Sequence, residues 1–217
     1  IPMLVAQILS LLYNIVDRIY IARIPNVGTT ALGAVGICFP LIMIITAFAN
    51  LFGSGGAPLF SINSGMKENQ KAQTIMNTSF TMVCASGAIL MVIGFLFARP
   101  LLALFGASED ALGYAYPYMM IYLIGTVPSM IATGMNPFIN AQGYATTGML
   151  SVAIGAVANL ILDPIFIFVI GFGIRGAAIA TILSQFLSAG YVLLFLEKRA
   201  EVKARLLKRK ELKSCRE

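Results

Sequence analysis

The chain has 217 residues, of which 59% are hydrophobic and 11% are charged, and it carries a formal net charge of +6 at pH 7. Soluble domains usually contain about 45–50% apolar and about 25% charged residues. This composition excludes an ordinary soluble enzyme, a disordered chain and a disulfide-rich scaffold, and it predicts a polytopic membrane protein.

The uncharged stretches of the sequence predict six membrane-spanning helices. Four stretches lack Asp, Glu, Lys and Arg altogether, namely 24–66, 72–98, 111–162 and 176–196. A spanning helix needs about 20 mostly apolar residues, and these stretches do not alternate as barrel strands do. We therefore expect an all-α membrane protein with one six-helix unit over residues 1–196. Its predicted spans are 2–22, 30–52, 73–97, 114–138, 147–170 and 176–196.

Glycine, proline and asparagine mark the expected links between the spans, because these residues favour turns. The links are 25–28, 53–71, 106–110, 142–143 and 171–176. In the second link, the glycines that begin at Gly53 are expected to end the helix. The charged segment from Lys67 to Lys71 is expected to complete the loop.

The basic residues predict the orientation in the membrane. Nine of the fifteen Lys and Arg residues follow Glu197, directly after the last apolar span. This distribution favours a cytoplasmic flank over a binding site for acidic lipid or nucleic acid. We therefore expect a plasma-membrane protein with both termini in the cytoplasm, no nucleic-acid partner, and a basic tail or inter-lobe linker over 197–217. The segment 197–213 is either a helix on the membrane surface or a solvated linker.

The residue types also exclude several kinds of site. The sequence has no His, and its three Cys residues are Cys38, Cys84 and Cys215. Two of these lie in apolar spans and one in the basic tail. Neither a zinc centre nor a disulfide framework is predicted, and no cofactor is expected.

Two carboxylates, Asp17 and Asp163, lie inside predicted spans. A charge at the bilayer centre costs about 2.5–3.5 kcal/mol on insertion scales, so such residues normally face the bundle interior or a wet cavity. Burial disfavours the charged form of a carboxylate, whereas hydrogen bonds or a bound cation favour it. An acid held between these influences can exchange a proton for a cation, as a coupled transporter requires. The alternative is a carboxylate that only caps or pairs with a neighbouring helix.

Polar residues at helical spacing accompany both acids and form three stripes. The stripes are Gln7, Ser10, Asn14 and Asp17 in the first span, Asn159 and Asp163 in the fifth, and Thr181, Ser184, Gln185 and Ser188 in the sixth. Counting from the predicted span ends places Asp17, Asp163 and Thr181 about 8–10 Å below the same membrane boundary. We expect one buried polar cluster in the outer half of the bundle. The alternative is that these Ser and Thr residues only serve helix packing.

Two neighbours of the acids bear on their role. Pro164 follows Asp163 and cannot donate a backbone N–H to the carbonyl of Leu160, so a kink is expected there. This kink is either a functional hinge or a harmless bend. Arg18 follows Asp17 but projects about 100° away from it on a helix. We expect Arg18 to snorkel toward the outer interface rather than to neutralise an acid.

Six short motifs in chain order resemble those of multidrug and toxic compound extrusion (MATE) transporters. They are Asn14-Ile15-Val16-Asp17; Ala34, Gly36 and Pro40; Gly53-x-Gly55-Gly56-Ala57 with Gly65 and Ala72; Ala141-Gln142-Gly143; Asn159-x-x-x-Asp163-Pro164; and Ala177-Ala178-x-Ala180-Thr181 with Ser184-Gln185. The resemblance covers residues 2–196 and corresponds to the first six-helix lobe of the family. Flippases of lipid-linked sugars share this fold.

The resemblance implies two six-helix lobes around a central cavity, and export of amphipathic or cationic compounds in exchange for H⁺ or Na⁺. By position, the cation site would be formed by Asp17, Asn159, Asp163 and Thr181, with Asn14 nearby. Any Na⁺ would bind at the two acids, and Pro164 would act as a hinge. The side chains expected to line the cavity are Gln7, Ser10, Asn136, Ser184 and Gln185. A second lobe is expected, either from the same parent chain or from a partner.

Three alternatives are open. A flippase of lipid-linked oligosaccharides would need basic residues for a pyrophosphate, whereas the spans contain essentially only Arg18. An intramembrane aspartyl protease would need two acids about 3 Å apart, one of them after a glycine, but Asp163 lies between Leu162 and Pro164. We therefore do not expect an enzyme. The third alternative is a truncated fragment that is inactive without its second lobe.

Overall fold

The computed structural model describes residues 2–25 and 27–198, and this part of the chain is helical without β-strands. The elements are α1 (Pro2–Ala22), α2 (Gly28–Gly65), α3 (Asn69–Leu104), α4 (Glu109–Ile124), α5 (Thr126–Ala141), α6 (Ala145–Pro164), the π-helical segment η1 (Ile165–Val169) and α7 (Ile174–Lys198). The expected all-α fold is confirmed. The predicted tail from residue 199 onward lies outside the described residues, so its two interpretations stay predictions.

The helices provide up to six membrane spans. Helices α1, α2, α3 and α7 are each long and apolar enough to cross a membrane, as is the continuous segment Ala145–Val169 formed by α6 and η1. Helices α4 and α5 together form the sixth candidate, which is bent by 59° between them. The expected number of spans is therefore found within the described residues.

The bend between α4 and α5 corrects the prediction of one uninterrupted helix over 114–138. Pro128 has no backbone N–H, so it cannot bond to the carbonyl of Ile124 in a continuous helix. Helix α5 starts its own ladder when Ser129 N–H donates to the carbonyl of Gly125 at 2.9 Å. A Cβ at Gly125 would lie 3.0 Å from the Cβ of Ile182 on α7. The bend thus lets the chain pass close to α7.

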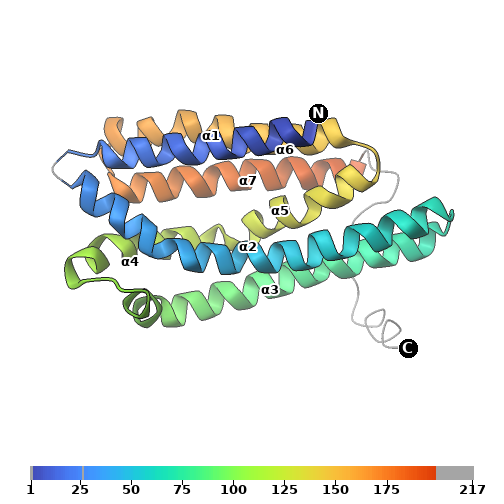
Figure 1. The fold of residues 1–217 in the computed structure, drawn as a ribbon, viewed down its shortest axis with the longest axis horizontal. Coiled ribbons are helices and arrows are strands. Elements are labelled where there is room, and N and C mark those ends of the chain that lie inside the picture. Colours follow the sequence, from blue (N-terminus) through green and yellow to red (C-terminus); the bar gives the residue numbers. More distant parts are fainter. Residues whose placement is uncertain (1, 26, 199–217) are drawn as a thin grey trace.

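The helices pack in two groups around α5 (Figure 1). Helices α1, α6 and α7 run side by side, whereas α2 and α3 form a long antiparallel pair on the other side of α5. The core between them contains buried Ile45, Met76, Met135, Phe138 and Val192. Large apolar side chains also remain exposed on the outside of the bundle, as expected for helices that face lipid.

The prediction that Gly53 ends the second span is wrong, because α2 continues through this residue to Gly65. The glycines here allow close helix packing instead of forming a turn. A Cβ at Gly53 would lie 2.8 Å from the Cα of Gly134 on α5, and one at Gly56 would lie 2.8 Å from Cζ of Phe138. Glycine therefore lets the backbones of α2 and α5 touch.

Glycine does form the later links, as predicted. Gly106, Gly143 and Gly171 have φ values of +91°, +87° and +79°, and Gly173 has +55°. These left-handed values cost L-residues with a Cβ more than they cost glycine. The links after α3, α5 and η1 are thereby confirmed.

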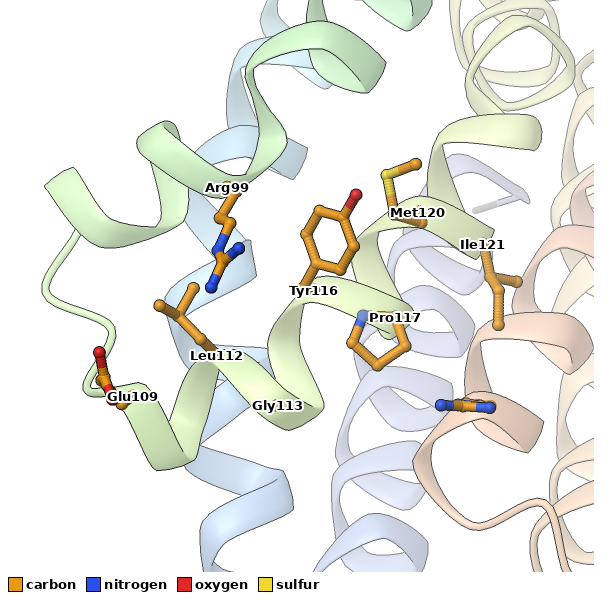
Figure 2. Close-up of a pocket in the computed structure, with 9 residues that line it drawn as sticks. Arg99, Glu109, Leu112, Gly113, Tyr116, Pro117, Met120 and Ile121 are labelled. Carbon is orange, nitrogen blue, oxygen red and sulfur yellow. The ribbon is translucent and has the colours of Figure 1, made fainter.

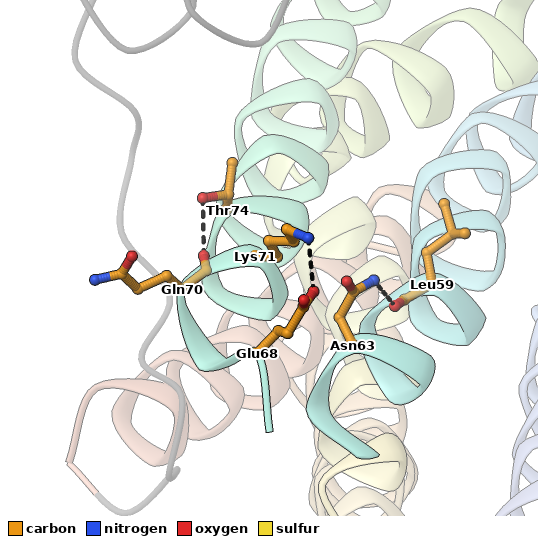
Figure 3. Close-up of polar contacts among 6 residues, drawn as sticks. All are labelled: Leu59, Asn63, Glu68, Gln70, Lys71 and Thr74. Carbon is orange, nitrogen blue, oxygen red and sulfur yellow. Dashed lines mark hydrogen bonds and ion pairs between the residues drawn. The ribbon is translucent and has the colours of Figure 1, made fainter. Parts of the chain in front are cut away.

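Helices α2 and α3 are too long for the hydrocarbon layer alone. Their 38 and 36 residues correspond to about 54–57 Å of helix, whereas the layer is about 30 Å thick. Polar contacts local to each helix lie at their shared end (Figure 3). Lys71 Nζ lies 2.8 Å from Glu68 Oε2, and Asn63 Nδ2 donates to the carbonyl of Leu59 at 2.8 Å. The α2–α3 turn is therefore suited to water rather than lipid.

The glycine contacts predict that two neighbouring Gly→Ala substitutions differ in their effect on the stability of the protein. Gly53→Ala is expected to destabilise the protein by about 1–3 kcal/mol, because its methyl group overpacks the α2–α5 contact. Gly55→Ala is the matched control, because a Cβ there would meet nothing within 4 Å. Thermal unfolding in detergent, followed by circular dichroism, measures both. Equal melting temperatures for the two variants would contradict this packing role.

Candidate cation site and cavity

Two acids that lie far apart in the chain meet between α1 and α6. Asp17 lies near the end of α1, and Asp163 lies in the last turn of α6, where it is 0% exposed. The two carboxyl groups are close enough to interact electrostatically. A hydrogen bond between two carboxyl groups requires that one of them carries a proton.

Helix α7 also contributes a side chain to the surroundings of these two acids. Asn159 Nδ2 donates to Asp163 Oδ1 at 3.2 Å and to Thr181 Oγ1 at 3.5 Å. Thr181 Oγ1 in turn donates to the carbonyl of Ala177 at 2.9 Å. The structure thus brings Asp17, Asn159, Asp163 and Thr181 together from three helices, and we refer to these four residues as the acid cluster.

The acid cluster contains more acceptors than donors. Asp17 Oδ1, Asn159 Oδ1 and Asp163 Oδ2 are buried, and none of them has a hydrogen-bond partner. Unpaired buried oxygens are costly, particularly in a membrane interior. A proton or a hard cation with a preference for oxygen ligands would satisfy them. The cluster can therefore hold H⁺ or a cation such as Na⁺.

Two tyrosines beside the acid cluster were missed in the sequence. Tyr13 and Tyr118 lie close enough to interact electrostatically with both Asp17 and Asp163. Tyr118 is 3% exposed, and its ring stacks on Tyr122 with centroids 6.3 Å apart. Tyr13 precedes Asp17 by four residues and so shares its helix face, a signal that could have identified it. Tyr118 has no comparable signal in its own segment.

Among the described residues, neither Asn14 nor Arg18 forms a hydrogen bond or ion pair with the acid cluster. The side chain of Asn14 is exposed, and its Nδ2 donates to the carbonyl of Ser10 at 2.7 Å within α1. Its role in cation binding stays a prediction. Arg18 Cζ lies 5.4 Å from the ring centroid of Phe39 on α2, a cation–π contact. Among the described residues, no ion pair joins Arg18 to an acid.

The backbone changes its helical geometry at Pro164. Regular α-helix ends at this residue, and η1 follows with a bond from the N–H of Ile170 to the carbonyl of Ile165 at 2.9 Å. A π-helical turn widens the helix by one residue and is frequent at functional sites. The irregularity therefore lies directly after Asp163, where the hinge was expected. Whether Pro164 moves stays a prediction.

A second polar region is a cavity of about 490 Å³ between α1, α2, α5, α6 and α7. The five side chains predicted to line a cavity all border it, namely Gln7, Ser10, Asn136, Ser184 and Gln185. Asn50, Ser54 and Asn140 also border it but were not predicted. Asn50 and Ser54 are four residues apart on α2, and Asn140 follows Asn136 by four on α5, a helical spacing that could have identified them. No charged side chain is among the described residues that line this cavity.

Amide and hydroxyl groups fix the wall of this cavity. Asn136 Nδ2 donates to the carbonyl of Gly148 at 2.9 Å and to Ser151 Oγ at 2.7 Å, which joins α5 to α6. Asn140 Nδ2 donates to Asn136 Oδ1 at 2.9 Å. Ser188 Oγ donates to the carbonyl of Ser151 at 2.8 Å, which joins α7 to α6. The polar lining is thus partly ordered by bonds between helices.

Residues 2–165 match the model of the MatE family. The chain belongs to the MatE family. An outward-facing structure of a multidrug resistance MATE family transporter of the MOP superfamily superposes with a TM-score of 0.88 at 28% identity, over 98% of this chain and 48% of that one. A MOP superfamily transporter from Pyrococcus furiosus gives a TM-score of 0.87 at 28% identity, again over 98% and 48%.

Two curated MatE relatives have named activities. The multidrug export protein MepA of Staphylococcus haemolyticus is 26% identical over 200 residues, and the FAD transporter of Shewanella oneidensis is 29% identical over 207 residues. Each alignment covers 92% of this chain but only 44% and 45% of the relative, respectively. The chain thus spans about half the length of these relatives. The expected family and its one-lobe architecture are confirmed, and this family is one of transporters rather than enzymes.

The bonds of Asn136 predict a loss of stability that is specific to this residue. Asn136→Ala is expected to cost about 1 kcal/mol, because interhelical side-chain bonds in membranes contribute about 0.6–1.7 kcal/mol. Asn63→Ala is the control, since Asn63 bonds within its own helix in the α2–α3 turn. Unfolding in mixtures of SDS and a mild detergent measures both variants. If both lost the same stability, Asn136 would not connect α5 and α6.

Proposed function

We propose that this chain forms the cation-coupling lobe of a secondary active exporter, which exchanges amphipathic or cationic compounds for H⁺ or Na⁺. The observation that carries this proposal is the acid cluster, with three buried oxygens that lack hydrogen-bond partners. Family membership supports transport as the activity. The choice between H⁺ and Na⁺ belongs to the proposal, because both satisfy the same oxygens.

The packing of α1 supports a role for the acid cluster in conformational change. Only 6% of the 18-residue apolar stretch with which α1 could cross the membrane is buried inside the bundle. Its main packing partner is α6. When Asp17 and Asp163 share a proton or bind a common cation, they hold α1 against α6. When both are charged and the site is empty, their repulsion weakens this contact. The bound cation thus shifts the population between two arrangements of the lobe.

The cavity lining supports small amphipathic or cationic substrates. Its amides, hydroxyls and apolar side chains offer hydrogen bonds without a fixed positive charge. A pyrophosphate-linked sugar would be expected to bind beside Lys or Arg, and neither lines this cavity among the described residues. An oligosaccharide flippase is therefore the less favoured function. One of the two relatives is a multidrug exporter and the other is an FAD transporter. Flavins should therefore be tested as substrates as well.

A second six-helix lobe completes the proposed transporter. The chain corresponds to about half of each matched MATE structure. Helix α1 leaves large apolar side chains exposed, among them Leu4 at 68% and Leu11 at 65%. These side chains would face lipid or the second lobe. The proposed orientation keeps both termini in the cytoplasm of a plasma-membrane protein, with the α2–α3 turn on the same side.

Cation binding is the first test of the acid cluster. Addition of Na⁺, or protonation between about pH 8.5 and 5.5, is expected to raise the melting temperature of the purified chain, because ligands that bind the folded state stabilise it. Asp163→Asn is expected to abolish this response. Asp110→Asn is the control, since Asp110 is an exposed acid at the start of α4. A response that survives in Asp163→Asn would refute the site.

Transport in the two-lobe protein is the second test. Asp163→Asn is expected to abolish cation-driven efflux of a fluorescent lipophilic cation from vesicles, while membrane insertion and fold are retained. Asp110→Asn is again expected to transport normally. Unchanged cation-dependent efflux in Asp163→Asn would contradict the proposed function. Cation binding without efflux in the single lobe would identify the chain as a binding-competent fragment that needs its second lobe.

A further inference from the structure

A second pocket opens at the end of the bundle opposite the α2–α3 turn, with a volume of about 780 Å³. One residue near the end of α3, most of α4 and the start of α7 line it. It shares no lining residue with the polar cavity and contains no member of the acid cluster. The pocket is therefore separate from the proposed transport site.

Two arginines give this pocket a positive mouth. Arg99 on α3 and Arg175 on α7 both line it, together with one acid, Glu109. Within the described residues, neither arginine has an ion-pair partner within 4.0 Å. The three side chains therefore leave a local charge of about +1 at neutral pH. In the proposed orientation this end faces the outside, where membrane proteins usually carry few basic residues.

The opposite wall of the pocket is apolar and follows α4 into the membrane. Figure 2 shows Arg99 beside Tyr116, with Pro117, Met120 and Ile121 further along the helix. The spacing of these four α4 residues places them on one helix face. Residue 121 lies about 18 Å along the helix axis from residue 109, at 1.5 Å per residue. The pocket thus joins a cationic mouth to an apolar wall formed by one face of α4.

We propose that this pocket binds an anionic phospholipid, with its phosphate between Arg99 and Arg175 and an acyl chain along the apolar face of α4. Guanidinium groups match phosphate oxygens in geometry and can bind them with two hydrogen bonds. A headgroup with net negative charge suits the pocket, whereas the amine of a zwitterionic lipid opposes its positive charge. The apolar wall favours a lipid over a soluble phosphate, which would leave this surface uncovered.

Native mass spectrometry of the purified chain in neutral detergent tests this assignment. The probes are phosphatidylglycerol, phosphatidylcholine with the same acyl chains, and glycerol 3-phosphate as the soluble source of the same chemistry. Phosphatidylglycerol is expected to bind at least about fivefold more tightly than phosphatidylcholine, since each basic residue contributes about fivefold at a membrane surface. Glycerol 3-phosphate is expected neither to bind nor to compete.

Five variants separate the pocket from general surface charge. Arg99→Gln and Arg175→Gln are each expected to lower phosphatidylglycerol affinity about fivefold, and the double variant about 25-fold. Arg23→Gln is the control, because Arg23 does not line the pocket. Circular dichroism checks the fold of each variant, and Arg99→Lys is expected to retain part of the affinity.

Several results would overturn the proposal. Equal affinities for the two lipids would contradict a role for headgroup charge. Equal losses of phosphatidylglycerol affinity in the three single Arg→Gln variants would contradict a role for the pocket. Competition by glycerol 3-phosphate would assign the pocket to a soluble phosphate instead of a lipid. If the double variant unfolds, the two single variants decide, and unchanged affinity in both of them overturns the site.

Discussion

The need to satisfy two carboxyl groups inside a lipid-facing bundle organises the acid cluster. Neither Asp17 nor Asp163 can be left alone there, because an isolated charge or unpaired oxygen in hydrocarbon is costly. The closeness of these residues, which lie far apart in the chain, requires that α1 packs along α6. Within α6, Asn159 then donates to Asp163, and the same amide also donates to Thr181 on α7. The packing of α1 and the chemistry of the cluster thus depend on each other.

The hydropathy of the chain was sufficient to predict the number of spans, since six apolar segments with links between them need no tertiary information. The helical spacing of Asn159 and Asp163 was sufficient to predict that these two side chains share a face of one helix. The breaks were harder to predict, because they depend on partners elsewhere in the fold. Gly53 has the composition of a turn, yet it lies inside α2 because Gly134 approaches its backbone.

At Gly53 a helix end was predicted where there is none, whereas at Gly125 a bend was not predicted. The segment around it is apolar enough for one straight span, and hydropathy alone gives no sign of the 59° bend. The bend depends on Pro128, which interrupts the hydrogen-bond ladder, and on Ile182, which leaves no room for a side chain at residue 125. Tyr118 could not be predicted for the same reason. It lies near the acids only because the bent α4–α5 segment crosses the bundle as it does.

The acid cluster and the polar cavity are connected through two helices. Tyr13 lines the cavity and also interacts with both acids. On α7, Ser184 lines the cavity, and its Oγ donates to the carbonyl of Thr181 at 2.7 Å. A change in the proton or cation content of the cluster would act on α1, which carries Asp17 and Tyr13 on one face. Since Gln7 and Ser10 belong to the same helix, a movement of α1 in the proposed transporter would reshape the cavity wall and change its affinity for substrate. In the proposed transporter, coupling between ion and substrate therefore needs no long relay, because one loosely packed helix contributes to both sites.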